Sequence, residues 1–337
     1  MKIIVPMAGM GKRMRPHTHT TAKPLLPIAG KPIVQRLVED LAAVAGEPVE
    51  EVAYVVHPSF GVKVEEELVA IAKAVGAKGS IHYQEVALGT AHAILCAEKA
   101  LSGRIIVAFA DTLFKAAFQF DQNEDGIIWT NAVENPSAFG VVKLDGTGVI
   151  TDFVEKPTVF VSNQAIVGIY YFREAEKLRA AIDHIIENNI REKNEFQLTT
   201  CLEKLKTDGL KFRTASVEEW LDCGNKEAVL HSNARMLALC HAAGENLVSE
   251  KAVLENSVVI QPSFVGAGAR VKNSVVGPHA SIGEGATVEN SVITDSIVQQ
   301  KARVKNAVLD STMIGQQSSF IASKSALNVG DFCDFKQ

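Results

Sequence analysis

The sequence lacks several features that would place it in other classes of protein. No apolar run reaches the roughly 18 residues that a membrane-spanning helix needs, and residues 1–6 lack the long apolar segment of a signal peptide. The net charge of −5 is not the basic excess typical of nucleic-acid binders. We therefore expect no membrane span and no nucleic-acid partner.

Cysteine is scarce and scattered along the chain. The five cysteines never take Cys-x-x-Cys spacing; they are Cys96, Cys201, Cys223, Cys240 and Cys333. A disulfide framework or a zinc site is therefore not expected, and a reducing, cytoplasmic location fits this usage.

The length of 337 residues suits two domains. The composition, 47% apolar and 22% charged, is typical of a globular protein. In residues 1–243, short apolar runs alternate with amphipathic stretches. The runs predict strands at 2–6, 52–56, 81–83, 104–109, 127–130, 149–154 and 166–172; the stretches predict helices from Pro32 onward and at 62–75, 90–101, 175–187 and 197–206. This alternation predicts a Rossmann-like α/β fold: a mostly parallel sheet with helices on both faces and ligands beyond the carboxyl ends of its strands.

Residues 244–337 follow a different pattern, in which an apolar residue recurs every five or six positions with small or turn-forming residues between. The recurring positions are Val253, Val259, Val265, Val271, Val276, Ile282, Val288, Ile293, Val298, Val304, Leu309, Ile314 and Phe320. A six-residue repeat predicts a left-handed parallel β-helix, here of about four coils. A β-sandwich would instead need alternation of period two. Residues 225–243 are predicted to form a helix that links the two domains.

A glycine-containing loop follows the first strand. Gly9 and Gly11 let backbone N–H groups approach a polyphosphate closely. Four cations gather around them in a chain that is otherwise slightly acidic: Lys12, Arg13, Arg15 and Lys23. The P-loop signature does not fit, because these two glycines are too close together; the dinucleotide fingerprint needs a small residue where Met14 stands.

Together with later elements, this loop resembles the signature of the sugar-phosphate nucleotidyltransferases, in particular glucose-1-phosphate thymidylyltransferase. Residues 6–27 carry Gly-x-Gly-x-Arg, Arg-Pro and Lys-Pro-Leu-Leu-Pro elements. Further similar elements follow in order at residues 84–91, 109–111, 139–142, 154–157, 168–170 and 220–224, so the resemblance covers about residues 1–230. Ala8, Lys12, Ala110 and Cys223 depart from the residues that are common in the family.

The resemblance implies a role for each matched residue. It assigns Arg13 to the leaving pyrophosphate, Lys23 to the α-phosphate, Lys156 to the sugar phosphate, and Asp111 and Asp222 to Mg²⁺. The implied nucleotide-binding residues are Ala8, Gly9, Gly11, Lys12, Gln84, Gly89 and Thr90. The implied sugar-phosphate residues, besides Lys156, are Gly140, Glu155, Gly168 and Lys193.

The implied reaction joins a nucleoside triphosphate to a sugar 1-phosphate and releases pyrophosphate. The attacking phosphate has a second pKa of about 6 and is already anionic near neutral pH, so no general base is required. The site must instead overcome the repulsion between anions and orient the reacting groups, which calls for cations and a metal ion.

Several alternatives stay open from the sequence. Asp111 and Asp222 could be helix caps, Lys156 could be a solvated surface residue, and the site could be that of a non-catalytic regulatory subunit. We favour glucose 1-phosphate with dTTP; mannose 1-phosphate with GTP, or a uridylyl transfer, is the alternative. For the β-helix we favour a role in a homo-oligomer over an acetyltransferase activity, because His279 is its only histidine.

Overall fold

The computed structural model describes residues 1–115 and 120–323. Contacts between residues group the chain into two compact units. The first unit comprises Met1–Leu26 and Lys31–Ala228, and the second comprises Pro27–Gly30 together with the chain from Val229 onward. Cys333 and the end of the predicted second domain lie outside the described residues. The predicted boundary between residues 243 and 244 stays a prediction.

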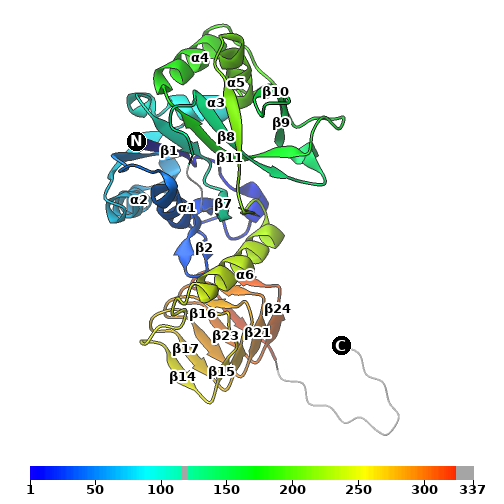
Figure 1. Cartoon of the computed structure of the whole chain (residues 1–337). Helices are drawn as coiled ribbons and strands as arrows, with labels where there is room; N and C mark the ends of the chain where they lie inside the picture. The colour runs from blue at the N-terminus through cyan, green and yellow to red at the C-terminus, as the bar shows by residue number, and fades with distance from the viewer. Residues whose placement is uncertain (116–119, 324–337) are drawn as a thin grey trace. The chain divides into compact units, whose positions relative to one another are not determined.

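The first unit is built on a nine-stranded mixed sheet (Figure 1). Seven strands run in the order β10-β9-β11-β6-β1-β4-β5, while β8 pairs with β11 and β12 pairs with β8. The bounds are β1 Lys2–Pro6, β4 Glu51–Val56, β5 Lys78–Tyr83, β6 Ile105–Ala108, β8 Gly126–Ala132, β9 Gly140–Leu144, β10 Ile150–Glu155, β11 Gln164–Phe172 and β12 Phe212–Ser216. The predicted α/β fold class is confirmed, and β6, β1, β4 and β5 are all mutually parallel.

The middle of the chain adds antiparallel pairs to this parallel part. β9 and β10 form a hairpin, and β11 pairs antiparallel with β6, β8 and β9. The carboxylate of Asp145 shapes the turn of this hairpin by accepting hydrogen bonds from the N–H groups of Thr147 and Val149. A turn this short can join only antiparallel strands, because a parallel pair needs a long crossover.

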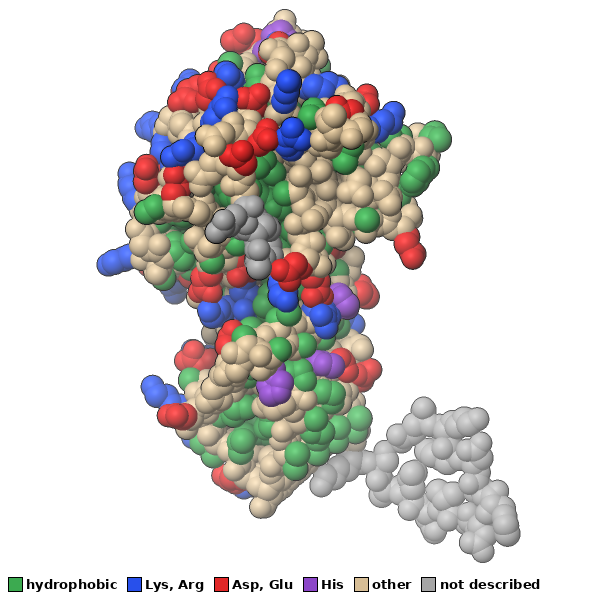
Figure 2. Space-filling model, viewed as in Figure 1, with side chains coloured by type: hydrophobic (Ala, Val, Ile, Leu, Met, Phe, Trp, Pro, Cys, Tyr) green, Lys and Arg blue, Asp and Glu red, His purple; other side chains and the backbone are tan. Residues whose placement is uncertain are grey.

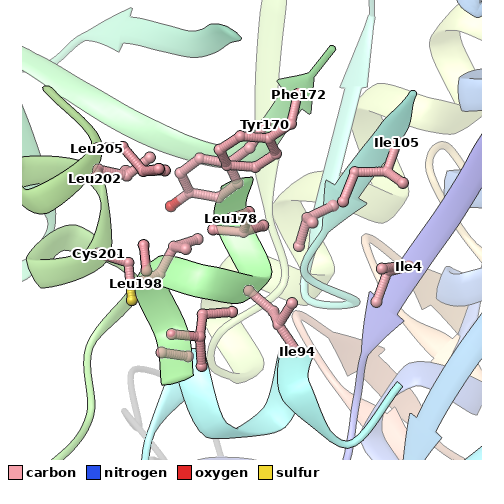
Figure 3. Packing of buried hydrophobic residues seen from close by; sticks show 14 of the residues in the cluster. Ile4, Ile94, Ile105, Tyr170, Phe172, Leu178, Leu198, Cys201, Leu202 and Leu205 are labelled. Atoms are coloured by element: carbon pink, nitrogen blue, oxygen red, sulfur yellow. The ribbon is translucent and has the colours of Figure 1, made fainter. Parts of the chain in front are cut away.

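One face of the sheet is covered by α3 (Thr90–Leu95), α4 (Ala175–Glu187) and α5 (Leu198–Thr207). Ile4 of β1 and Ile105 of β6 share a buried apolar cluster with residues of these helices, including Ile94, Leu178 and Leu202 (Figure 3). α3 is shorter than the predicted helix over 90–101, because Glu98–Ala100 forms a separate 3₁₀ turn.

Helices also cover the opposite face, which carries the alternate side chains of the same strands. Ile3, Val52 and Gly79 lie in register on β1, β4 and β5. A Cβ on Gly79 would lie 2.8 Å from Cα of Val69, so α2 (Val62–Ala74) packs directly on this face. α1 (Ile33–Val44) buries Leu37 and Val38 completely. The predicted helices on both faces are therefore confirmed.

The second unit contains the predicted β-helix, made of three parallel sheets. β14-β17-β20-β23-β26 form the first sheet, β15-β18-β21-β24 the second and β16-β19-β22-β25 the third. The strands are β14 Val253–Glu255, β15 Val258–Val259, β16 Phe264–Val265, β17 Arg270–Lys272, β18 Val275–Val276, β19 Ser281–Ile282, β20 Thr287–Glu289, β21 Val292–Thr294, β22 Ile297–Val298, β23 Arg303–Lys305, β24 Val308–Asp310, β25 Met313–Ile314 and β26 Ser319–Ile321.

The interior of the β-helix consists of the predicted recurring residues. Those from Val265 to Val304 are buried together with small alanines between them. At the first coil the register differs by one position: Leu254, not Val253, is the partner of Val271. Leu254 in the first coil and Phe320 in the last described coil are each 42% exposed, because a coil at the end of a stack is covered on one side only.

The part of helix α6 (Lys226–Ala242) from Val229 onward and residues Pro27–Gly30 complete the second unit around a buried asparagine. Oδ1 of Asn233 accepts hydrogen bonds from the backbone N–H of Ala29 at 2.9 Å and from Oγ of Ser281 at 2.8 Å. Its Nδ2 donates to the backbone oxygen of His279. In the described part of the chain no helix has both the length and the apolar character to cross a membrane.

Candidate active site

The predicted phosphate loop begins where β1 ends. Gly11 adopts a left-handed conformation with φ of 56°, and a Cβ there would lie 2.9 Å from Cβ of Lys23. The hydroxyl of Thr18 donates to the backbone oxygen of Gly11, and the buried side chain of Met14 anchors the 3₁₀ turn that follows. The loop therefore requires glycine at position 11 and folds back against the segment that carries Lys23.

A cavity of about 410 Å³ opens above this loop. The loop follows β1, Gln84 follows β5, and Phe109 follows β6, so the cavity lies beyond the carboxyl ends of parallel strands, as predicted. Ten of the predicted site residues line it: Ala8, Gly9, Gly11, Lys12, Arg13, Lys23, Gln84, Gly89, Thr90 and Asp111.

Asp222 reaches the same neighbourhood through a two-stranded sheet, in which β7 (Thr112–Lys115) pairs antiparallel with β13 (Glu219–Asp222). Asp222 lies opposite Thr112, and the N–H of Cys223 donates to the backbone oxygen of Asp111 at 3.0 Å. The side chain of Lys23 donates to Oδ2 of Asp111 at 3.0 Å.

The two carboxylates affect each other. Burial raises the pKa of Asp222, and the negative charge of Asp111 raises it further, while a hydrogen bond from the N–H of Gly224 and the charges of Lys23 and Arg13 oppose the rise in pKa. Arg13, Lys23, Asp111 and Asp222 thus share one electrostatic environment.

The predicted base-reading loop is held by close backbone contacts. Gly89 has a φ of 124°, and a Cβ there would lie 2.4 Å from the backbone oxygen of Phe196, so only glycine fits. The amide nitrogen of Gln84 donates to the backbone oxygen of Gly89 at 3.3 Å. The hydroxyl of Thr90 donates to Gln197 and accepts from the N–H of Leu198, so it holds the start of α5.

The predicted sugar-phosphate residues form a second group. Gly140 lies opposite Glu155 on neighbouring strands, and Nζ of Lys156 lies 3.4 Å from Oε1 of Glu155. Nζ of Lys193 donates to the backbone oxygens of Glu155 and Lys156, at 3.1 and 2.9 Å. Lys156 has a positive φ of 45°, so the backbone of its turn is strained, and the hydrogen bonds from Lys193, whose own φ is 51°, stabilise that turn.

Gly168 and the neighbouring Tyr170 connect the two groups. The backbone oxygen of Gly168 accepts from the N–H of Phe109, whose ring lies edge-on to Tyr170. Burial raises the pKa of Tyr170, and the charges of Glu155 and Asp111 raise it further, so this side chain is close to both acids. Gly140, Glu155, Lys156, Gly168, Lys193 and Asp222 are not among the residues that line the cavity in the described part of the chain.

Two known families match the chain. The family described as nucleotidyl transferase matches residues 2–238, and the family described as GlmU-like, C-terminal hexapeptide matches residues 243–325. The chain belongs to the nucleotidyl transferase family. The predicted resemblance and the predicted class of enzyme are thereby confirmed.

Individual relatives agree with this membership. The bifunctional protein GlmU of Methanococcus maripaludis is 31% identical over 274 residues, and the match covers 78% of this chain but only 62% of that protein. Glucose-1-phosphate thymidylyltransferase of Streptomyces antibioticus is 32% identical over 289 residues, covering 80% of this chain and 74% of that protein. A crystal structure of UDP-glucose pyrophosphorylase complexed with UDP-glucose matches with a TM-score of 0.59 and 26% identity, covering 71% of this chain and 98% of that one. This chain thus spans less than two thirds of the GlmU relative.

In this nucleotidyl transferase chain, Asp111 and Asp222 are the residues that could hold a metal ion. The described residues contain no group of three or more His, Cys, Asp or Glu side chains suited to one. Two carboxylates suit Mg²⁺, which takes its other ligands from water and substrate phosphates. The raised pKa of Asp222 fits this use, since a cation would relieve the repulsion between two neighbouring acids.

Sequence reasoning missed two polar residues of this site. Glu195 lines the cavity, and its carboxylate accepts a hydrogen bond from the side chain of Gln197. His92 lies behind the base-reading loop, with Nδ1 3.0 Å from the amide nitrogen of Gln84. His92 is on α3. Its place two positions after the predicted site residue Thr90 was the only sequence signal for it.

Proposed function

We propose that this chain transfers a nucleoside monophosphate from a nucleoside triphosphate to a sugar 1-phosphate, with release of pyrophosphate. The proposal rests on one observation: two cations and two carboxylates from three distant parts of the chain share one environment at the loop that contains Gly9 and Gly11. They are Arg13, Lys23, Asp111 and Asp222. Such a combination neutralises a polyphosphate and positions its phosphorus for attack.

The residues of the cavity have distinct tasks in this proposal. Arg13 is exposed at the loop and binds the leaving pyrophosphate. Lys23, which is nearly buried, stabilises charge that develops on the α-phosphate. Mg²⁺ held by Asp111 and Asp222 would supply Lewis-acid stabilisation of the phosphate oxygens. Ala8, Gly9, Gly11 and Lys12 provide the surrounding backbone and charge.

The second group of residues binds the sugar 1-phosphate. The ammonium of Lys156 is half-exposed and lies next to Glu155, so it can contact a phosphate while the carboxylate accepts hydrogen bonds from sugar hydroxyls. A Cβ at Gly140 would lie 3.2 Å from Oε2 of Glu155, so the lack of a side chain at this position leaves space beside the carboxylate. Gly168 likewise leaves room beside Thr112.

We propose glucose 1-phosphate and dTTP as the substrates, because the spacing of Gln84 and Gly89 resembles that of thymidylyl- and uridylyl-transferring enzymes. The thymidylyltransferase of Streptomyces antibioticus supports this choice. Mannose 1-phosphate with GTP, or a uridylyl transfer, is the alternative. A matrix of nucleoside triphosphates against sugar 1-phosphates, scored by pyrophosphate release with Mg²⁺, tests the proposal. No release from any pair would refute it, and would favour the regulatory alternative.

For the β-helix we propose self-association of the chain. Val258 and Val308 are 57% and 82% exposed, and they border a cleft with a ladder of hydrogen-bonded asparagines, Asn256, Asn273, Asn290 and Asn306. Hydrophobic side chains also gather on the near face of this unit in Figure 2. Light scattering of the whole chain tests the oligomeric state, and a monomer at micromolar concentration would refute the proposal.

A second activity, acetyl transfer, is the alternative for the β-helix. His279 favours it, because its Nδ1 lies 3.0 Å from Oδ1 of Asp295, and a carboxylate in this place orients an imidazole as a base. Incubation with acetyl-coenzyme A and an amino-sugar phosphate distinguishes the two roles. Transfer of the acetyl group would establish the enzymatic alternative, and its absence would leave self-association as the role of this unit.

A further inference from the structure

The amide of Gln84 is held by two acceptors on its nitrogen side. Gln84 follows β5, lines the cavity and is 7% exposed. Its Nε2 lies 3.3 Å from the backbone oxygen of Gly89 and 3.0 Å from Nδ1 of His92. A backbone oxygen can only accept, so the contact with Gly89 decides which end of the amide is the nitrogen.

This geometry also determines the state of His92. A glutamine NH₂ has two hydrogens, and both are used when it donates to Gly89 and to His92. Nδ1 of His92 must therefore be an acceptor, which requires a neutral ring with its proton on Nε2. Burial lowers the pKa of His92, in agreement with a neutral ring.

The oxygen end of the amide remains for the ligand. Among the described residues Oε1 of Gln84 has no hydrogen-bond partner, and it is not one of the buried polar atoms without a partner, so it is accessible. An oxygen can only accept a hydrogen bond. The ring N3–H of thymine or uracil can donate to it, whereas N3 of cytosine carries a lone pair and would be repelled.

We propose that His92 is a positioning residue that locks the amide of Gln84 with its oxygen toward the nucleotide, and thereby makes the site select thymine or uracil over cytosine. The proposal rests on the proposed nucleotidyl transfer. His92 is not one of the residues that line the cavity, so it acts through Gln84 rather than on the nucleotide.

Without His92, the amide loses one of the two contacts that set its orientation. Gly89 alone still favours the same orientation, but rotation that presents NH₂ to the base becomes less costly. One net hydrogen bond corresponds to about a tenfold change in an equilibrium constant. The change should fall on nucleotide binding, because Gln84 touches neither the α-phosphate nor the sugar 1-phosphate in this proposal.

The test compares His92→Leu with His92→Asn. Asparagine places an oxygen near the position of Nδ1 and can accept from Gln84, whereas leucine has a similar size and no acceptor. The substrates are dUTP and dCTP, which differ only at N3 and position 4 of the base. We expect His92→Leu to raise KM for dUTP about tenfold with kcat changed less than about twofold, and to lower the preference for dUTP over dCTP by a similar factor. His92→Asn should stay within about threefold of the unaltered protein.

Each outcome decides the proposal. An unchanged preference in a folded His92→Leu variant overturns it, as does an equal loss in the leucine and asparagine variants. If the unaltered protein releases no pyrophosphate with any nucleotide, the proposed function has failed instead.

A second measurement reads the state of His92 in the unaltered protein and needs a variant only for the assignment. Nitrogen-15 spectra of the histidine rings in the unaltered protein, with His92 assigned by its loss in His92→Asn, report the tautomer at neutral pH. A neutral ring protonated on Nε2 is expected. A ring protonated on Nδ1, or an imidazolium, would overturn the proposal.

Discussion

Nζ of Lys23 lies 3.0 Å from Oδ2 of Asp111, although 88 positions separate the two residues. The lysine side chain is 10% exposed and the carboxylate is 44% exposed. The lysine is therefore fixed by its surroundings while the acid remains accessible from the cavity. This pair brings the end of β6 together with the phosphate loop.

Replacing Asp111 with asparagine tests the proposed metal site. Asp111→Asn keeps the shape of the side chain but removes the charge, so we expect a loss of Mg²⁺-dependent pyrophosphate release of at least about 100-fold. The measurement is a magnesium titration of pyrophosphate release at saturating substrates. Asp208→Asn is the control, because Asp208 also pairs with a lysine, Lys204, but lies exposed at the end of α5. Full activity of Asp111→Asn in a folded protein would contradict the assignment.

Replacing Lys156 tests the proposed sugar-phosphate group. The ammonium of Lys156 is half-exposed, and among the described residues its salt bridge is to Glu155. We expect Lys156→Ala to raise KM for the sugar 1-phosphate more than about tenfold, because a charge-assisted contact to phosphate is lost. KM for the nucleotide should change less than about twofold. Equal losses for both substrates would mean that Lys156 supports only the fold.

Lys193 is expected to act through Lys156. Its ammonium donates to two backbone oxygens of the strained turn, and these bonds occupy it without any ligand. Lys193→Ala should raise KM for the sugar 1-phosphate by a smaller factor, about threefold to tenfold. The double variant Lys156→Ala/Lys193→Ala should be no worse than Lys156→Ala alone. If the two effects multiply, Lys193 contacts the phosphate independently.

Much of this site could be predicted from the sequence because strand ends position it. Gly11, Gln84 and Asp111 each come directly after, or shortly after, a strand of the parallel part, and parallel strands end at one edge of a sheet. The six-residue repeat of the second unit was equally informative, because each coil places one apolar residue per face.

The contacts that depend on pairing between distant segments could not be predicted. Asp222 reaches Asp111 through the pairing of β13 with β7, and nothing in either short strand specifies its partner. The contact of His92 with Gln84 depends on how α3 begins against Phe196. The bonds of Lys193 to Glu155 and Lys156 come from a turn in which both Lys193 and Asn194 have positive φ; Asn194 is a residue type that favours such a φ, but Lys193 is not.

A partly buried acid in α1, Asp40, gives a prediction for the dependence of stability on pH. Burial raises the pKa of Asp40 from 3.8 to about 6, and the charge of Arg36 only partly opposes this rise in pKa. The native protein therefore binds this proton more tightly than the unfolded chain does. The contribution of this bound proton to the free energy of unfolding is fully present below about pH 4 and is lost as the pH rises through about 6. At neutral pH the ionised carboxylate costs the native state about 3 kcal/mol.

Asp40→Asn should accordingly raise the free energy of unfolding of the first unit by up to about 3 kcal/mol at pH 7.5, and by much less at pH 4.5. Both tryptophans, Trp129 and Trp220, lie in the first unit, so urea unfolding followed by tryptophan fluorescence reports this unit. Glu39→Gln is the control with the opposite sign: burial raises the pKa of Glu39, but hydrogen bonds from Lys31 and Gln35 outweigh it and lower the pKa, so the neutral variant should lose stability at pH 7.5. If Asp40→Asn were less stable than the unaltered protein at pH 7.5, the attraction between Asp40 and Arg36 would have to outweigh the cost of burying the charge.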